Sequence, residues 1–182
     1  IIKTLNTLKN KPLFIFISSS YVYQSSEYKI KENFKTNPQT LYGKLKLNCE
    51  KYIRKQYQNY CILRLFNIYG KDQPSTFFVP DIVEKIKKKQ LINLNKSKRD
   101  YIHVNDVLKI IDFVIKEKIN NIINVGSGKG TSLTSLIYRI SKKLKIKPIL
   151  RLNNQHDKFV ANISKLRKIG YSNKINEKIF NF

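Results

Sequence analysis

The chain contains few residues of the kinds that build covalent or metal-bound frameworks. Of its 182 residues only two are cysteine, Cys49 and Cys61, and only two are histidine, His103 and His156. Two cysteines that each lie inside an apolar pattern do not provide a disulfide framework or the ligand spacing of a zinc site. We therefore expect no metal site and a reducing, cytoplasmic environment.

Two further absences concern the membrane and the start of the chain. No apolar run approaches the ~18 residues of a membrane-spanning helix, and no signal-peptide pattern is visible, so we predict no membrane span. Methionine is absent altogether and the first residue is Ile1, whereas an open reading frame begins with methionine. The sequence is therefore interpreted as a piece of a longer protein.

Acidic residues are scarce, since 12 Asp and Glu oppose 36 Lys and Arg and leave a formal net charge of +24. Such a charge is typical of nucleic-acid binders. Arg occurs only six times, however, and the many Lys residues are scattered along the chain together with abundant Ile, Asn, Phe and Tyr, as expected from an AT-rich genome. We predict no nucleic-acid partner. The positive field instead suits an anionic sugar nucleotide.

What the chain does contain is a regular alternation of apolar segments. A hydrophobic share of 41%, with ten Phe and eleven Tyr, indicates a packed globule. Buried-type strands that alternate with helices predict an α/β fold whose parallel sheet is covered on both faces. The expected strands are 13–17, 61–66, 91–94, 99–104, 121–125 and 147–152; the expected helices are 41–53, 77–89, 105–118, 132–144 and 163–169; and 21–40, 67–76 and 153–162 read as loops.

Two polar clusters point to chemistry. Ser18, Ser19 and Ser20 follow the first strand, and Tyr42 and Lys46 share one face of the next helix. A free Tyr hydroxyl is a poor base at pH 7, but a neighbouring cation favours its phenolate, and a Ser can share the substrate oxygen. Because an exposed Tyr-x-x-x-Lys pair also occurs on ordinary helices, the preceding Ser cluster is what favours catalysis.

Several segments, in this order, resemble the NAD-dependent nucleotide-sugar epimerase/dehydratase family of extended short-chain dehydrogenases/reductases. They are ISSSYVY at 17–23, the Tyr-x-x-x-Lys pair at 42–46, RLFNIYG at 64–70, RDYIHVNDV at 99–107, NVGSG at 124–128 and ANISKLRKIGY at 161–171. The resemblance implies the C-terminal part of a Rossmann-type, doubly wound parallel sheet with a small mixed α/β substrate lobe. Residues 1–70 would be the remainder of the Rossmann sheet, and residues 71–182 the substrate lobe with the last sheet elements.

The resemblance also implies residue roles at the reacting centre. Ser19, Tyr42 and Lys46 would be the catalytic triad, with Tyr42 as the acid/base. Ser18, Tyr42, Lys46 and Phe66 would contact the cofactor, which is NAD or, as a second possibility, NADP. The family's Gly-rich dinucleotide turn has no counterpart, so the nucleotide-binding start is absent from this sequence.

Substrate contacts follow in the same way. The nucleotide-sugar substrate would meet Ser19, Tyr42, Asn67 and Arg99, with Arg99 at the diphosphate, where a guanidinium fork is suited. The family's basic stretch near the end is replaced here by residues 153–157, which leaves diphosphate binding there open. The Gly-Ser-Gly-Lys-Gly loop at 126–130 fails as a dinucleotide fingerprint and as a P-loop, so a plain strand-to-helix turn is favoured.

The resulting expectation is NAD-dependent epimerisation of a nucleotide sugar through a transient keto-sugar. Ser20 and Tyr21 stand where dehydratases carry Asp-Glu, which disfavours water elimination. An NADPH-dependent 4-keto-sugar reductase and a non-catalytic remnant or binding subunit stay open as alternatives. The family further implies a homodimer of the full-length protein, to which the helix stripe Leu41, Leu45, Cys49, Tyr52 and Ile53 would contribute.

Overall fold

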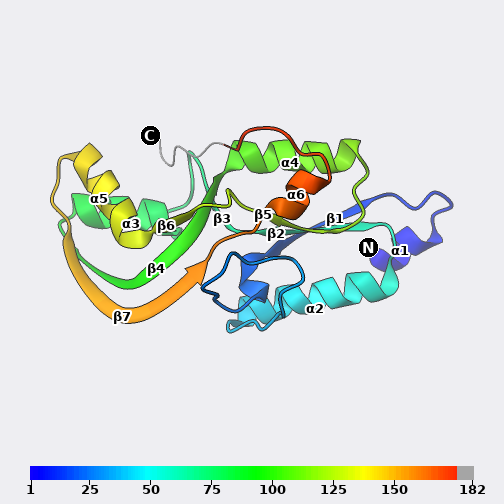
Figure 1. Ribbon diagram of the computed structural model, residues 1–182, viewed down its shortest axis with the longest axis horizontal. Helices are drawn as coiled ribbons and strands as arrows, with labels where there is room; N and C mark the ends of the chain where they lie inside the picture. Colours follow the sequence, from blue (N-terminus) through cyan, green and yellow to red (C-terminus); the bar gives the residue numbers. More distant parts are fainter. Residues whose placement is uncertain (176–182) are drawn as a thin grey trace.

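A computed structural model describes residues 1–175 of the chain and contains two β-sheets that lie end to end (Figure 1). The first sheet is parallel, with the order β1-β2-β5, from β1 (Phe14–Ser19), β2 (Tyr60–Leu65) and β5 (Ile122–Val125). The central strand reads as a continuous apolar run because helices cover both of its faces.

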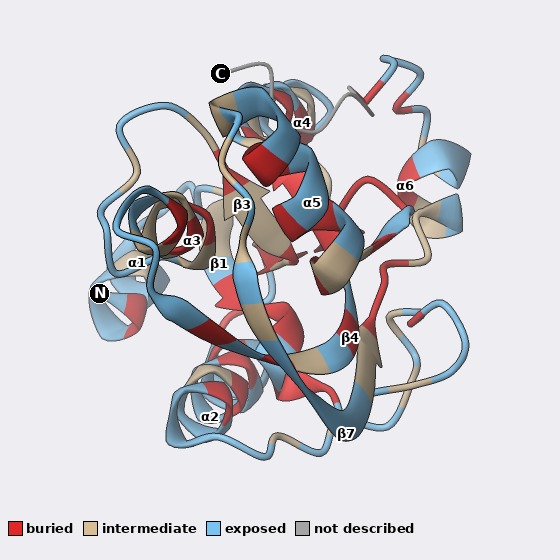
Figure 2. Cartoon of the chain, turned by 90° about the vertical axis from the view of Figure 1, so that its left-hand side faces the viewer, coloured by how far each residue is buried: buried red, intermediate tan, exposed pale blue. Residues whose placement is uncertain are grey.

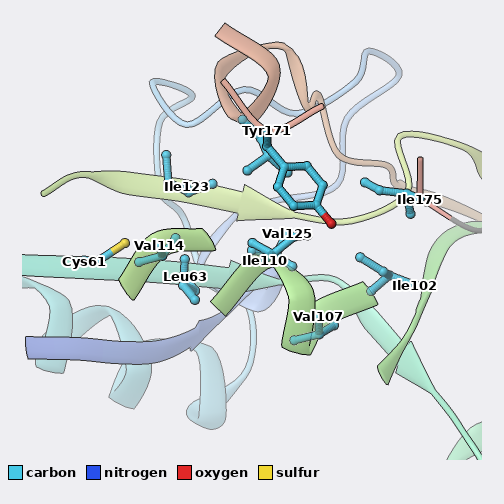
Figure 3. Close-up of a cluster of buried hydrophobic side chains, with 11 residues drawn as sticks. Cys61, Leu63, Ile102, Val107, Ile110, Val114, Ile123, Val125, Tyr171 and Ile175 are labelled. Atoms are coloured by element: carbon cyan, nitrogen blue, oxygen red, sulfur yellow. The ribbon is translucent and has the colours of Figure 1, made fainter. Parts of the chain in front are cut away.

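Helices cover both faces of this sheet. On one face, α1 (Ile2–Thr7) and α2 (Leu41–Gln56) pack through a cluster that includes Ile53 and Tyr57. On the other face, α4 (Val104–Lys116) and α6 (Ser164–Lys168) bury the main core, whose central side chains are drawn in Figure 3. This arrangement confirms the predicted α/β class and the doubly wound parallel sheet.

The second sheet is mixed and is organised around one long strand, β4 (Leu91–His103). Its parallel neighbours are β3 (Asn67–Tyr69) at one end and β7 (Ile149–Phe159) at the other, and β6 (Gly130–Ser132) is antiparallel. The helices α3 (Phe78–Lys87) and α5 (Leu133–Leu144) pack on it and bury a second apolar cluster, visible as red segments in Figure 2.

The second sheet departs from the sequence-based expectation. Leu91–His103 is one strand rather than two short ones, and β7 continues through residues 153–159, which the sequence indicated as loop. The two strands pair in parallel with one register shift, at Asn95 and Lys96. The polar middle segments of β4 and β7 are paired through backbone hydrogen bonds, although many of their side chains are exposed. Hydrophobic patterning alone therefore does not predict these parts of the strands.

Helix starts follow local capping. The Thr40 hydroxyl accepts a hydrogen bond from the Gly43 N–H at 3.1 Å, and α2 begins at the next residue, Leu41. The helix that the sequence predicted over 105–118 begins one residue earlier, at Val104. Strand β4 runs to His103, whose Nδ1 accepts from the Asn105 N–H at 3.2 Å, so the helix starts at Val104.

Within residues 1–175 no helix has the length and apolarity needed to cross a membrane. The same residues contain no cluster of three or more His, Cys, Asp or Glu side chains that could hold a metal ion. The domain boundary near residue 70 stays a prediction.

Candidate active site

The candidate site forms where β1 ends and α2 begins. Ser18 and Ser19 are the last residues of β1, and both are buried. The Ser19 Oγ accepts a hydrogen bond from the Tyr21 N–H at 3.2 Å and so caps the single 3₁₀ turn η1 (Ser20–Val22). This turn redirects the chain at the C-terminal edge of the parallel sheet, the usual position of ligand sites in such folds.

A close backbone contact brings α2 against this turn. A Cβ atom on Gly43 would lie 2.2 Å from the Tyr21 carbonyl oxygen, so only glycine permits the approach. Beside it, the rings of Tyr21 and Tyr42 meet edge to face with their centroids 6.4 Å apart. Tyr42 is half exposed and therefore accessible to a ligand.

Lys46 completes the constellation one helical turn later. Its Nζ donates a hydrogen bond to the Ile17 carbonyl oxygen at 2.8 Å. The same ammonium lies 5.0 Å from the centroid of the Phe16 ring and 5.7 Å from that of Tyr42. The fold thus brings Tyr42, Lys46 and the end of β1 together; their catalytic roles stay predictions.

Sequence reasoning missed a buried acid on the same helix face. Glu50 follows Tyr42 and Lys46 at the same four-residue spacing, and this spacing was the available signal. It accepts a hydrogen bond from the Ser18 Oγ at 2.5 Å and pairs with Arg64 of β2, with Nη2 to Oε2 at 2.6 Å. Glu50 is 1% and Arg64 3% exposed, so this ion pair lies in the interior.

The network extends beneath the sheet edge. The Arg64 Nη1 donates to the Tyr23 hydroxyl at 2.7 Å, and that hydroxyl donates to the Asn124 Oδ1 at 2.8 Å. Burial raises the pKa of Tyr23 to about 12, so it stays a neutral donor. Burial acts to lower the pKa of Arg64, but its hydrogen bonds and charge interactions with Glu50 and Tyr23 together outweigh this effect and raise it.

The two residues that follow β2 have different environments. Phe66 is buried in a cluster with Val22 and Leu47, and its nicotinamide contact stays a prediction. Asn67 is partly buried, and its Nδ2 donates to the Asp100 carbonyl oxygen at 3.1 Å. This bond fixes the amide beside β4, with the substrate contact again a prediction.

Arg99 lies near the triad but is already paired. Its Nη1 and Nη2 donate to the two carboxylate oxygens of Asp157 at 2.8 and 2.6 Å. The guanidinium carbon lies 5.1 Å from the centroid of Phe159, and the Phe159 ring contacts Tyr21 at 5.8 Å between centroids. Because Tyr21 in turn contacts Tyr42, a continuous row of aromatic rings links Arg99 to the candidate acid/base.

The loop at 126–130 serves an internal carboxylate. Asp100 is fully buried and accepts from the Ser127 N–H at 2.7 Å, the Ser127 Oγ at 2.6 Å and the Gly128 N–H at 2.9 Å. It also accepts from the Ala161 N–H at 3.1 Å. Burial raises the pKa of Asp100 to about 6 although these bonds act to lower it. Because Asp100 occupies these loop donors, the geometry supports the interpretation as a turn rather than a phosphate loop.

A cavity of about 720 Å³ lies at some remove from the triad, between α3, α5 and the loop after β3. Tyr69, Val83, His103 and Leu144 are among its lining residues, and none of the predicted site residues lines it. Because none of the predicted site residues lines the cavity, the edge of β1 rather than this cavity is the candidate active site.

Comparison with known proteins agrees with this geometry. Residues 2–126 match the NAD dependent epimerase/dehydratase family. An uncharacterized UDP-glucose epimerase of Bacillus subtilis is 29% identical over 68% of this chain and 42% of its own length. The dTDP-4-dehydro-6-deoxyglucose reductase of Escherichia coli is 32% identical over 75% of this chain and 47% of its own length. The chain thus spans less than half the length of these curated relatives.

Among solved structures, the UDP-N-acetylglucosamine 4-epimerase of Methanobrevibacter ruminantium M1, in complex with UDP-N-acetylmuramic acid, superposes with a TM-score of 0.81. It is 26% identical to this chain, and the match covers 97% of this chain and 61% of that one. Residues 2–126, which match the family, include β1, α2 and β2. These elements carry Ser19, Tyr42, Lys46 and Arg64. From this match and the shared fold we conclude that the chain belongs to the NAD-dependent epimerase/dehydratase family.

Proposed function

We propose that the protein to which this chain belongs epimerises a nucleotide sugar, and that this chain supplies its acid/base and substrate-binding residues. The observation that carries the proposal is that Lys46 of α2 hydrogen-bonds the end of β1 and lies over the Tyr42 ring, while the Tyr42 ring contacts Tyr21 in the turn that Ser19 caps. Family membership supports the reaction class, and the similarity to UDP-sugar epimerases supports the substrate class.

In the proposed mechanism Tyr42 removes the proton of a sugar hydroxyl, and Ser19 hydrogen-bonds the same oxygen. Lys46 holds a positive charge beside the phenol ring, which favours the deprotonated oxygen as the keto-sugar forms. Tyr42 returns the proton after the keto-sugar has turned its other face. Arg99 anchors the diphosphate, so that the sugar can turn while the nucleotide stays bound.

A bound NAD would supply reversible hydride transfer to this reaction. Tyr42 and Lys46 would hold its nicotinamide end, and this assignment is supported by the Lys46 ammonium, which lies over the Tyr42 ring and hydrogen-bonds the Ile17 carbonyl oxygen at the end of β1. The residues of this chain do not fit its pyrophosphate, because the Gly-rich loop at 126–130 directs its amide groups at Asp100. Pyrophosphate binding is therefore left to parts of the protein outside these residues.

The test is Tyr42→Phe in the full-length protein. Loss of general acid–base catalysis lowers kcat by roughly 10²–10⁴-fold and leaves NAD affinity nearly unchanged. Tyr52→Phe is the matched control, since Tyr52 is similarly exposed on the same helix. Equal turnover of the Tyr42→Phe variant and the wild type would mean that Tyr42 is only a surface residue.

A second candidate is an NADPH-dependent 4-keto-sugar reductase, which the similarity to the Escherichia coli reductase favours. The two reactions differ in stoichiometry. An epimerase interconverts two sugars without net consumption of the dinucleotide, whereas a reductase oxidises one NADPH for each product. Following absorbance at 340 nm while the sugars are separated by chromatography distinguishes them. A protein that binds the sugar nucleotide but converts nothing would be a binding subunit.

A further inference from the structure

The Arg99 guanidinium is engaged by a carboxylate of its own chain. Both terminal nitrogens donate to Asp157, in a bidentate pair whose side chains are 15% and 33% exposed. Nη1 also donates to the Lys98 carbonyl oxygen at 3.2 Å. The pair lowers the pKa of Asp157, so the carboxylate is charged at neutral pH. The two charges of the pair therefore cancel locally.

A phosphate and a carboxylate compete for the same guanidinium edge. Bidentate recognition uses two parallel N–H donors, and Arg offers this fork equally to carboxylate and phosphate oxygens. On Arg99 the fork formed by Nη1 and Nη2 already holds the two oxygens of Asp157. Phe159 stacks near one face of the guanidinium and limits approach from there. A diphosphate can bind the Nη1–Nη2 edge of Arg99 only by displacing Asp157.

The neighbouring cations do not remove this competition. Lys96 donates from its Nζ to the Asn154 Oδ1, and the Lys158 Nζ donates to the Glu27 carbonyl oxygen, so both are held by other acceptors. Residues 153–157 also lack the arginine that the family motif would provide. Arg99 is therefore the guanidinium next to the aromatic row that leads to Tyr42, and its fork is held by Asp157.

We propose that Asp157 is a specificity-determining residue, a built-in competitor for Arg99 that a sugar-nucleotide diphosphate must displace. This inference rests on the proposed function, because it takes Arg99 as the diphosphate anchor. A doubly charged diphosphate carries more negative charge than the carboxylate that it replaces. The competition with Asp157 therefore selects a diphosphate over a singly charged anion, such as a carboxylate metabolite or a phosphate diester.

The test measures UDP affinity of the 182-residue chain by calorimetry, without NAD and without turnover. Asp157→Asn keeps the side-chain size and removes the competing charge, so UDP should bind about tenfold more tightly, and a phosphate diester should gain at least as much. The control is Asp112→Asn, which makes the same charge change at an exposed position of α4 and should alter affinity less than twofold. It isolates the local competition from the effect of net charge.

The anchor is tested in parallel. Arg99→Gln should abolish the gain from Asp157→Asn in the double variant, and Asp157→Ser, which also removes the carboxylate, should repeat that gain if the Asn variant folds poorly. Unchanged or weaker UDP binding in both Asp157 variants would overturn the competitor role, and so would a chain in which no variant binds UDP. Neither result affects the conclusion about turnover by Tyr42. The proposed function is tested separately, by the activity of the Tyr42→Phe variant.

Discussion

At the scale of single residues, the buried pair of Glu50 and Arg64 connects α2 to the first sheet. Glu50 receives the Ser18 hydroxyl and both sides of the Arg64 fork, and neither partner is appreciably exposed. Two charges in the interior are tolerated only as a pair, because removing one leaves the other desolvated and uncompensated. The position of Ser18 relative to α2 thus depends on this carboxylate.

Glu50→Gln should therefore lower the free energy of unfolding by about 3 kcal/mol, since Arg64 is left as a buried charge. The control is Glu84→Gln, which breaks the exposed pair with Lys88 and should cost at most about 0.5 kcal/mol. Urea unfolding of both variants measures the difference. Similar losses in the two variants would contradict a specific role of the buried pair.

The sequence could predict Ser19, Tyr42 and Lys46 as a group because helical spacing and strand ends are local features. It could not predict that Arg64 meets Glu50, because that contact joins β2 to α2 and depends on how the two pack. The pairing of Arg99 with Asp157 was hidden for the same reason. Residue types can be read from the chain, whereas partners far apart in sequence are fixed only by the fold.

At the scale of elements, α2 has two differently used apolar surfaces. Leu47 and Ile53 face the sheet and are buried, whereas Leu41, Leu45 and Tyr52 are about half exposed or more, and Cys49 is exposed as well. The sequence-based stripe therefore runs along the solvent side, and including Ile53 in it was wrong. An exposed apolar stripe of this kind is typical of a protein–protein contact.

We expect this stripe to form the homodimer contact of the full-length protein. Leu45→Glu places a charge in the middle of it and should shift a dimer towards monomer at least tenfold, because an unpaired charge would be buried in the contact. Leu108→Glu on α4 is the matched control, since Leu108 is similarly exposed on another helix. Sedimentation velocity measures the monomer–dimer equilibrium of the two variants. Equal dissociation of both would exclude the apolar stripe of α2 as the dimer contact.

Elements differ in how far the sequence reveals them. The strands β1, β2 and β5 were predicted because each contains a run of apolar residues, as strands of a helix-covered parallel sheet do. The short strand β3 and the polar half of β7 were predicted as loops, and β6 falls where a turn and the start of a helix were predicted. Their pairing with β4 comes from backbone hydrogen bonds that any side chain permits, so hydrophobic periodicity carries little trace of it.

At the scale of the whole molecule, the two sheets are joined at the candidate site. The first sheet and α2 supply Ser19, Tyr42 and Lys46, and β4 and β7 of the second sheet supply Arg99 and Asp157 (Figure 1). The Asp100 carboxylate holds the loop after β5 and the chain at Ala161 together, which fixes one sheet relative to the other. The residues proposed as substrate-binding and acid/base groups therefore keep a fixed separation.

The same whole-molecule view predicts how this chain handles the dinucleotide. It offers Tyr42 and Lys46 to the nicotinamide end, but the pyrophosphate of a dinucleotide normally rests on a Gly-rich turn at a helix N-terminus. In the Gly-rich loop at 126–130, the amide groups of Ser127 and Gly128 donate hydrogen bonds to the Asp100 carboxylate. We therefore expect the 182-residue chain alone to bind NAD more weakly than about 100 μM, which corresponds to roughly 5.5 kcal/mol.

Calorimetric titration of NAD into the chain checks this expectation, with UDP as the comparison ligand in the same buffer. Because Arg99 and the aromatic row belong to this chain, UDP binding should persist where NAD binding is lost, and the ratio of the two affinities is the informative quantity. Low-micromolar NAD binding would mean that the pyrophosphate has a site among these residues. Since the Asp100 bonds hold the loop at 126–130, Asp100→Ala would then show whether that loop provides it, by raising NAD affinity as the amide groups become free.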